Sequence, residues 1–212
     1  MHGSNILPTL PNSSWKWYTE HVSAGAQHGR DLVAERAVWD VRITQKAMVL
    51  GSRQDESLLN GEQCSRDGIE VVRRRSGGGI VFLAPGEHVW LDVVVPRGDV
   101  LWSNDVAQAS WWLGDVWVQT LNALGKNNVS VHHESLSSDQ WGDLLCFAGV
   151  GPGEVVQRND ESLSKLVGIS QRRTRDYARF QCTIYSKWNP RDVEMYVMNT
   201  PGNLSEIAHR VA

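Results

Sequence analysis

A chain of 212 residues with 41% hydrophobic and 21% charged residues can bury a core, and this balance is ordinary for a globular protein. The net charge of -3 leaves no basic excess to neutralise phosphates, which excludes an electrostatic nucleic-acid binder. The three cysteines, at positions 64, 146 and 182, contain no C-x-x-C pair, so we expect neither a disulfide framework nor a cysteine-based zinc site. No signal peptide or spanning apolar run is visible, and we therefore expect a cytoplasmic protein without a membrane partner.

The first half of the chain predicts one helix and four strands. Residues 1–14 are expected to form a flexible leader, and residues 15–212 a single domain. The spacing of Leu32, Val33, Val38 and Trp39 predicts an amphipathic helix over Gly29–Ile43. Apolar, β-branched runs predict the strands that follow; they cover Ala47–Leu50, Ile69–Val72, Ile80–Leu83 and His88–Val95.

The second half predicts a long helix, more strands and two short closing helices. Ser103 or Asn104 can cap a helix over Asn104–Leu124, and Gly125 suits the left-handed position after it. Strands are predicted over Val129–His133, Leu144–Ala148, Glu154–Gln157, Lys165–Gln171 and Arg179–Tyr185, and helices over Val193–Met198 and Leu204–Val211. Mixed elements with hairpin-like neighbours indicate an α+β (mixed α/β) fold with one mainly antiparallel sheet flanked by helices.

Three consecutive glycines between two apolar strands are the most specific feature of the sequence. Arg73, Arg74, Arg75 and Ser76 precede Gly77–Gly79. Glycine backbone can approach a ligand closely, and successive N–H groups can form a nest for phosphate or carboxylate oxygens, to which arginines add charge-assisted contacts. A flexible hairpin with solvated arginines is the alternative. A P-loop and a Rossmann fingerprint are excluded, because the loop leads into a strand.

Three motifs in order resemble the lipoate-protein ligase A family, a branch of the biotin/lipoate ligase superfamily. The first is Val49-Leu50-Gly51-Ser52-Arg53-Gln54, similar to the Gly-x-x-Gln segment that precedes the family's glycine loop. The second is Val71-Val72-Arg73-Arg74-Arg75-Ser76-Gly77-Gly78-Gly79-Ile80-Val81-Phe82, similar to that loop itself. The third is Lys165-Leu166-Val167-Gly168-Ile169-Ser170-Gln171-Arg172, similar to the family's lysine strand.

The resemblance implies a fold like the catalytic domain of biotin protein ligases and a set of site residues. Lys165 would be the catalytic lysine, hydrogen-bonded to the activated carbonyl and phosphate. Substrate and nucleotide would be bound by the residues Gln54, Arg74, Ser76, Gly77, Gly78, Gly79 and Gly168. A fixed cation and backbone N–H groups suit this chemistry, because they stabilise the charge of an acyl-adenylate and of its transition state. No metal ligand is expected.

Two departures from the family pattern and one cysteine leave the choice between an adenylate and a thioester mechanism open. Leu83-Ala84 stand where the family often has His-Asp, and the chain ends about 40 residues after Lys165, so no C-terminal accessory domain is expected. Asp143-Leu144-Leu145-Cys146-Phe147 resembles the Cys-Phe segment of octanoyl and lipoyl transferases, in which the cysteine carries the acyl group as a thioester. A small buried hydrophobe is the other interpretation of Cys146. Asp143 is a weaker candidate for the acidic partner of Lys165.

Three functions follow as expectations. The first is a ligase that attaches lipoate to a carrier lysine through lipoyl-AMP, using ATP and Mg²⁺ and no permanently bound cofactor. The second is an octanoyl or lipoyl transferase with Cys146 as nucleophile. The third is a non-catalytic acyl- or carrier-binding protein. The implied partners are a lipoyl carrier domain or a glycine-cleavage H-type carrier protein, and a separate accessory subunit.

Overall fold

The computed structural model describes residues 14–159 and 162–211. Residues 1–13 of the expected leader lie outside this part of the chain. Ten strands and four α-helices are assigned within it. The strands are β1 (Lys16–Val22), β2 (Ala37–Ile43), β3 (Ala47–Leu50), β4 (Glu70–Arg73), β5 (Val81–Leu83), β6 (His88–Pro96), β7 (Val129–Val131), β8 (Val155–Asn159), β9 (Ser162–Arg173) and β10 (Tyr177–Tyr185). The helices are α1 (Ala24–Gly29), α2 (Gly61–Arg66), α3 (Trp111–Ala123) and α4 (Gln140–Leu144), with 3-10 turns η1 (Glu56–Leu58), η2 (Cys146–Ala148), η3 (Pro190–Val193) and η4 (Leu204–Arg210).

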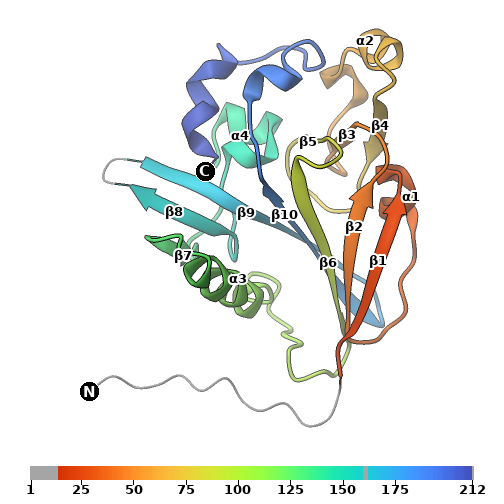
Figure 1. The fold of residues 1–212 in the computed structure, drawn as a ribbon, viewed down its shortest axis with the longest axis vertical. Helices are drawn as coiled ribbons and strands as arrows, with labels where there is room; N and C mark the ends of the chain where they lie inside the picture. The colour runs from red at the N-terminus through yellow and green to blue at the C-terminus, as the bar shows by residue number, and fades with distance from the viewer. Residues whose placement is uncertain (1–13, 160–161, 212) are drawn as a thin grey trace.

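A seven-stranded sheet forms the centre of the fold (Figure 1), in the order β1-β2-β6-β10-β9-β8-β7. The β1–β2 pair is parallel, and every other neighbouring pair in this sheet is antiparallel. A second sheet of three strands has the order β4-β3-β5. The expected α+β fold with a mainly antiparallel sheet is confirmed.

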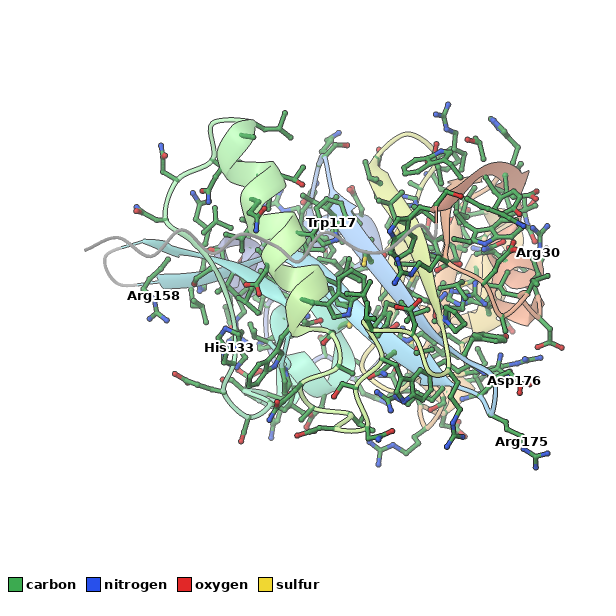
Figure 2. All side chains as sticks on the ribbon, turned by 90° about the horizontal axis from the view of Figure 1, so that it is seen from below. Arg30, Trp117, His133, Arg158, Arg175 and Asp176 are labelled. Carbon is green, nitrogen blue, oxygen red and sulfur yellow. The ribbon has the colours of Figure 1, made fainter. Side chains whose placement is uncertain are left out.

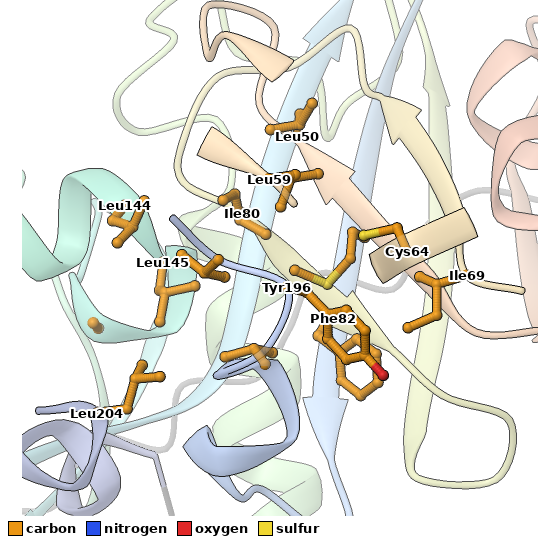
Figure 3. Packing of buried hydrophobic residues seen from close by; sticks show 14 of the residues in the cluster. Leu50, Leu59, Cys64, Ile69, Ile80, Phe82, Leu144, Leu145, Tyr196 and Leu204 are labelled. Atoms are coloured by element: carbon orange, nitrogen blue, oxygen red, sulfur yellow. The ribbon is translucent and has the colours of Figure 1, made fainter. Parts of the chain in front are cut away.

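The two faces of the large sheet are covered by different parts of the chain. Helix α3 lies across one face, and Trp117 points from it toward the sheet and packs on the core there (Figure 2). Even-numbered residues of β10, such as Phe180 and Cys182, belong to this core. The small sheet, α4 and the C-terminal turns cover the other side, where Phe82, Leu145 and Tyr196 lie in a second core (Figure 3). The odd-numbered residues of β10 face this second side, where the candidate site lies.

The predicted helix over Gly29–Ile43 is wrong, because Ala37–Ile43 forms strand β2. The strand is paired on both edges, with β1 and with β6. Its β-branched residues Val38, Val41 and Ile43 suit a pleated surface, and tertiary pairing overrides the helical spacing seen in the sequence.

The predicted helix over Asn104–Leu124 begins later than expected, at Trp111. Ser103 and Asp105 form local turns instead of a cap. The amide of Asp105 donates to Ser103 Oγ, and the amide of Ala107 donates to Asp105 Oδ1. Short polar side chains that bond to nearby backbone compete with the helix, which explains the lost turns. The left-handed residue after the helix is confirmed, since Gly125 has a φ of +87°.

The predicted strand over Leu144–Ala148 is also wrong. Leu144 ends helix α4, which Asp139 caps by accepting from the amide of Gly142, and Cys146–Ala148 is a 3-10 turn. The other predicted strands are present within a few residues of their expected bounds. The first closing helix, predicted over Val193–Met198, is wrong, because only Val193 lies in the 3-10 turn η3 and Val197 forms an isolated bridge with Leu59. The second closing helix is the 3-10 turn η4 instead of an α-helix. Strand β1 and helices α1, α2 and α4 were not predicted.

Candidate active site

The glycine loop, residues 73–79, passes directly over the segment that follows β3. A Cβ atom at Gly51 would lie 1.9 Å from the carbonyl oxygen of Gly78, so the two backbones touch. Gly78 has a φ of +100°, a conformation that L side chains rarely adopt. Within the described residues the amides of Gly77–Gly79 donate to no protein acceptor. Three neighbouring N–H groups are therefore available to an anion.

Arg74 holds this loop from behind rather than pointing out of it. The side chain is buried, and its guanidinium donates to the carbonyls of Gly77, at 2.8 Å, and Gly79, at 2.9 Å. It also donates to the carbonyl of Val49 at 3.4 Å. The hydrogen bonds of Arg74 thus fix the loop geometry, and its predicted contact with the phosphate stays a prediction.

Gln54 connects two segments of the site. Its Oε1 accepts from the amide of Gly51 at 3.0 Å, and its Nε2 donates to the carbonyls of Asp143, at 3.0 Å, and Leu144, at 3.1 Å. The side chain therefore ties the turn after β3 to the end of α4, directly before Cys146.

Cys146 lies against the glycine loop because Gly79 has no side chain. A Cβ atom at Gly79 would lie 2.7 Å from the backbone nitrogen of Cys146. That nitrogen donates to the carbonyl of Ile80 at 2.9 Å, and Ile80 forms an isolated bridge with Leu145. The partly exposed Sγ lies 3.9 Å from Nη2 of Arg74. The thiol is therefore held beside the fixed guanidinium of Arg74.

Lys165 is buried, and a carboxylate neutralises its charge. Its Nζ lies 2.8 Å from Oε2 of Glu154 and donates to the carbonyl of Cys146 at 2.7 Å. Glu154 accepts two more hydrogen bonds, from the amides of Gly151, at 2.7 Å, and Ile169, at 3.1 Å. The lysine is thereby fixed next to the Cys146 backbone. Asp143, the acidic partner considered from the sequence, instead accepts from Ser138 Oγ at 2.8 Å.

A β-bulge in β9 turns Lys165 toward the site. Val156 pairs with Lys165, but Val155 pairs with Val167, which leaves Leu166 as an extra residue. In regular alternation Lys165 would share a face with Val167, which packs in the core under α3. The extra residue reverses the alternation, so Lys165 points to the opposite face.

Gly168 and Ser76 complete the wall formed by β9. A Cβ atom at Gly168 would lie 3.1 Å from the ring of Phe147, so a larger residue would require this ring to shift. The ring of Phe147 in turn lies 5.1 Å from Nζ of Lys165. Ser76 is buried, and its hydroxyl donates to Oγ of Ser170 at 3.1 Å.

These residues surround two connected cavities. The outer cleft has a volume of about 450 Å³; it is lined by Arg53, Gln54, Ser76, Gly77, Gly78, Gly79, Leu136, Ser138, Gly142, Asp143, Cys146, Gly149, Gly151, Pro152, Glu154, Lys165, Ile169, Ser170 and Gln171. The inner crevice is narrow, about 40 Å³, and is lined by His28, Val49, Arg74, Val81, Trp90, Cys146, Phe147, Glu154, Gly168, Ile169, Ser170, Gln181 and Thr183. Cys146, Glu154, Ile169 and Ser170 line both cavities, so the crevice opens into the cleft at the thiol.

The structure brings all nine residues predicted from the motifs to these two cavities, and it adds three that the sequence analysis missed. Glu154, His28 and Gln181 are buried polar residues of the site. Glu154 reaches Lys165 only through the bulged pairing of β8 with β9, and no short sequence motif contains both residues. The signal available in the sequence was the glutamate that follows two glycines in Gly151-Pro152-Gly153-Glu154, at the start of a predicted strand.

The other two cysteines lie outside the site. Cys182 is buried in the core under α3, and burial raises the pKa of its thiol to about 12. Cys64 is buried in helix α2, where burial also raises the pKa of its thiol.

Neither a metal centre nor a membrane span is found in the described residues. No group of three or more His, Cys, Asp or Glu side chains in residues 14–159 and 162–211 is arranged to hold a metal ion. Across the same residues, no helix combines the length and apolar character that crossing a membrane requires.

Comparison with known proteins gives one family and a consistent fold. The family model of the lipoyl protein ligase A/B catalytic domain matches residues 23–208. A bipartite lipoate protein ligase from Thermoplasma acidophilum, described together with its E2 lipoyl domain, has a TM-score of 0.67 at 12% identity, over 94% of this chain and 74% of that chain. A protein from the same archaeon with bound lipoic acid has a TM-score of 0.67 at 12% identity, over 93% and 74% of the two chains. Lipoate-protein ligase A bound with ATP has a TM-score of 0.63 at 14% identity, over 93% and 74%. No curated protein matches the chain significantly.

Proposed function

Because the chain belongs to the lipoyl protein ligase A/B catalytic family, we propose that it attaches a lipoyl or octanoyl group to a lysine of a carrier domain. The observation that carries this proposal is the meeting of the inner crevice and the outer cleft at Cys146 and Glu154, beside the fixed amine of Lys165. An acyl chain in the crevice would place its carbonyl at this junction, and the carrier lysine would approach through the cleft.

The inner crevice supports the acyl part of the proposal. Val49, Val81, Trp90 and Phe147 supply apolar walls, as binding sites for small molecules generally have. The crevice has room for only part of an eight-carbon chain, so we expect these side chains to move apart as the chain enters.

The transfer step requires stabilisation of the oxyanion that forms when the carrier amine attacks the acyl carbonyl. The unpaired amides of Gly77–Gly79 and the ammonium group of Lys165 are fixed donors beside the junction. Donors that are already in place stabilise developing charge without reorganisation, which is the main source of catalysis in such reactions. The new amide bond forms as the bond to the leaving group breaks, and the amine loses a proton to water.

Lipoyl-AMP is one acyl donor that the site supports. A lipoate carboxylate oxygen would attack the α-phosphorus of ATP and release pyrophosphate, and the carrier amine would then release AMP. The outer cleft, at about 450 Å³, lies within the size range of small-molecule sites and carries the free amides of the glycine loop. Mg²⁺ would arrive on the ATP phosphates, since it favours phosphates and water over a cage of protein ligands. A structure of lipoate-protein ligase A with ATP supports this route by analogy.

A thioester on Cys146 is the second route, and the position of the thiol favours it. The Cys146 thiolate would attack the carbonyl of a thioester or acylated-carrier donor, forming a C–S bond and releasing the donor group. The carrier amine would then break this C–S bond and restore the thiolate. Sγ lies at the mouth of the crevice and 3.9 Å from the Arg74 guanidinium, as such a nucleophile needs.

One experiment tests the function and separates the two routes. The chain is incubated with a lipoyl carrier domain and either lipoate plus Mg²⁺ and ATP or an octanoyl-thioester donor, and the carrier mass is measured. We expect one acyl group per carrier with wild type and loss of labelling with Lys165→Met. Cys146→Ser should abolish labelling only if the thioester route operates, whereas the control Cys64→Ser, at a residue that lines neither cavity, should label normally. Absence of labelling with both donors would leave a non-catalytic acyl- or carrier-binding protein. An accessory subunit would be required if labelling appears only after a second polypeptide is added.

A further inference from the structure

The C-terminal turn η4 packs behind the candidate site. A capping box between Asn203 and Glu206 begins this turn. Ile207, in the middle of the turn, is buried in the same core as Leu145 and Ala148. Since these two residues flank the short turn η2, η4 lies directly behind the segment that carries the thiol.

The end of η4 and the residue after it hold the backbone of Lys165. Val211 forms an isolated parallel bridge with Lys165. Strand β10 pairs with β9 over Val167–Arg173, so at Lys165 the edge of β9 that β10 leaves is taken by Val211. The hydroxyl of the buried Ser164 also donates to the carbonyl of His209 at 2.6 Å. The lysine is therefore braced from the C-terminal side as well as from β8.

The side chain of Arg210 joins the same segment to α4 and to η2. Its guanidinium makes two parallel bonds with Asp139, from Nη1 to Oδ1 at 3.0 Å and from Nη2 to Oδ2 at 2.8 Å. Its Nη1 also donates to the carbonyl of Ala148 at 2.9 Å. Asp139 caps α4 and Ala148 ends η2, so one guanidinium holds both ends of the segment that contains Cys146.

The turn η2 depends on contacts from outside for its position, because it is only three residues long. Gln54 holds the residues before it from the side of the cleft, and Lys165 donates to the carbonyl of Cys146. Arg210 holds its far end. Among the residues that the structure describes, Arg210 lines neither cavity, so it can act on the reaction only through the backbone of η2.

We propose that residues 209–211 form a brace that sets the position of η2 against Lys165, and that Arg210 is the positioning residue of this brace. The proposal rests on the proposed function, because the brace acts on the acyl-transfer site. A displacement of reacting groups by about 1 Å costs on the order of a hundredfold in rate. The brace is one of several contacts on η2, so its loss should lower the transfer rate by about tenfold.

Three variants separate positioning from a general loss of stability. Arg210→Gln removes both the ion pair and the bond to the Ala148 carbonyl. Asp139→Asn removes only the charge of the ion pair, since asparagine caps a helix as well as aspartate and the bond to Ala148 remains. Arg30→Gln is the matched control: Arg30 lies 2.8 Å from Glu20, and its side chain is 29% exposed, against 27% for Arg210.

The first measurement is the rate of carrier labelling at increasing concentrations of lipoate with Mg²⁺ and ATP, or of an octanoyl-thioester donor. We expect Arg210→Gln to lower kcat about tenfold with the KM of the donor unchanged, because Arg210 contacts no substrate. Asp139→Asn and Arg30→Gln should stay near wild type. Arg210→Lys, which keeps the charge but not the planar fork, serves if Arg210→Gln fails to fold, and it should lower kcat in the same way.

Hydrogen exchange of the full chain gives a second readout that does not depend on catalysis. In Arg210→Gln, peptides covering residues 144–150 should exchange about tenfold faster, whereas peptides from β6 and the whole of Arg30→Gln should match wild type. Unchanged exchange or unchanged kcat in Arg210→Gln, or an equal fall of kcat in Asp139→Asn, would overturn the brace and leave the proposed function intact. Absence of carrier labelling by wild type with either donor would overturn the proposed function, and the positioning role with it.

Discussion

Glutamine in place of Glu154 would remove the negative charge from a buried ion pair while preserving the shape of the side chain. The side chains of Lys165 and Glu154 are only 2% and 8% exposed, and their charged atoms are 2.8 Å apart. Removing one partner of such a pair leaves the other charge buried and uncompensated, which costs about 3–5 kcal/mol. The total stability of a domain is roughly 5–15 kcal/mol, so the loss would be a large fraction of it.

A double-mutant cycle measures this contribution. Glu154→Gln, Lys165→Met and the double variant are unfolded in urea and followed by circular dichroism. We expect each single variant to lose about 3–5 kcal/mol and the double variant to lose much less than the sum. The coupling between the two sites should be about 2–3 kcal/mol, near the upper end for residues in contact.

The control is an exposed pair, Arg42–Asp40, whose atoms are 3.0 Å apart and whose arginine side chain is 61% exposed. Asp40→Asn should cost less than about 1 kcal/mol, because solvent screens this pair. If Glu154→Gln behaves like this control, or if its effect adds to that of Lys165→Met, Glu154 does not fix Lys165 and the argument fails.

Three further predictions concern the glycine loop, the acid stability and the thiols. Gly79→Ala should displace the Cys146 backbone and lower carrier labelling at least tenfold, whereas Gly77→Ala, with nothing within 4 Å of the new Cβ, should label nearly as wild type. The Arg210 guanidinium lowers the pKa of Asp139 to about 2. Because the folded pKa lies below the unfolded one, the stabilisation from the Asp139 carboxylate is present above about pH 4 and is lost toward pH 2. Arg210→Gln should therefore flatten that part of a curve of stability against pH. Iodoacetamide should modify Cys146 first under native conditions, since the other two thiols are buried, and peptide mass spectrometry identifies the adduct.

The positions of the loop and of Lys165 were predictable because each motif is contiguous in the sequence. Gly77–Gly79 lie between two apolar runs that do form strands β4 and β5, and Lys165 begins a run that does lie within β9. Local pattern and tertiary structure agree in these segments. The predicted helix is wrong over Ala37–Ile43. The apolar spacing there fits a helix, but the backbone of this segment pairs with the two neighbouring strands β1 and β6.

The partner of Lys165 was not predictable, because it depends on a register that local sequence does not encode. Simple alternation along β9 assigns Lys165 to the same face as Val167 and hence to an apolar core. Only the pairing with β8 reveals the extra residue at Leu166. The same pairing brings Glu154, which directly precedes β8, within reach of the lysine. A single shift in strand register therefore decides both where the lysine points and which acid neutralises it.

The ion pair of Lys165 with Glu154 limits which groups of the cleft can attract an anion. Lys165 and Glu154 together carry no net charge, so the attraction of the cleft for an anionic group must come largely from elsewhere. The buried guanidinium of Arg74 donates to the carbonyl of Gly77, and this carbonyl belongs to the same peptide unit as the amide of Gly78. A cation on the oxygen side of a peptide polarises it and strengthens its N–H as a donor, since hydrogen bonds in series reinforce one another. Under the proposed function, Arg74 would act on a bound anion through the backbone without touching it, which would give the buried arginine and the three glycines of this loop one shared role.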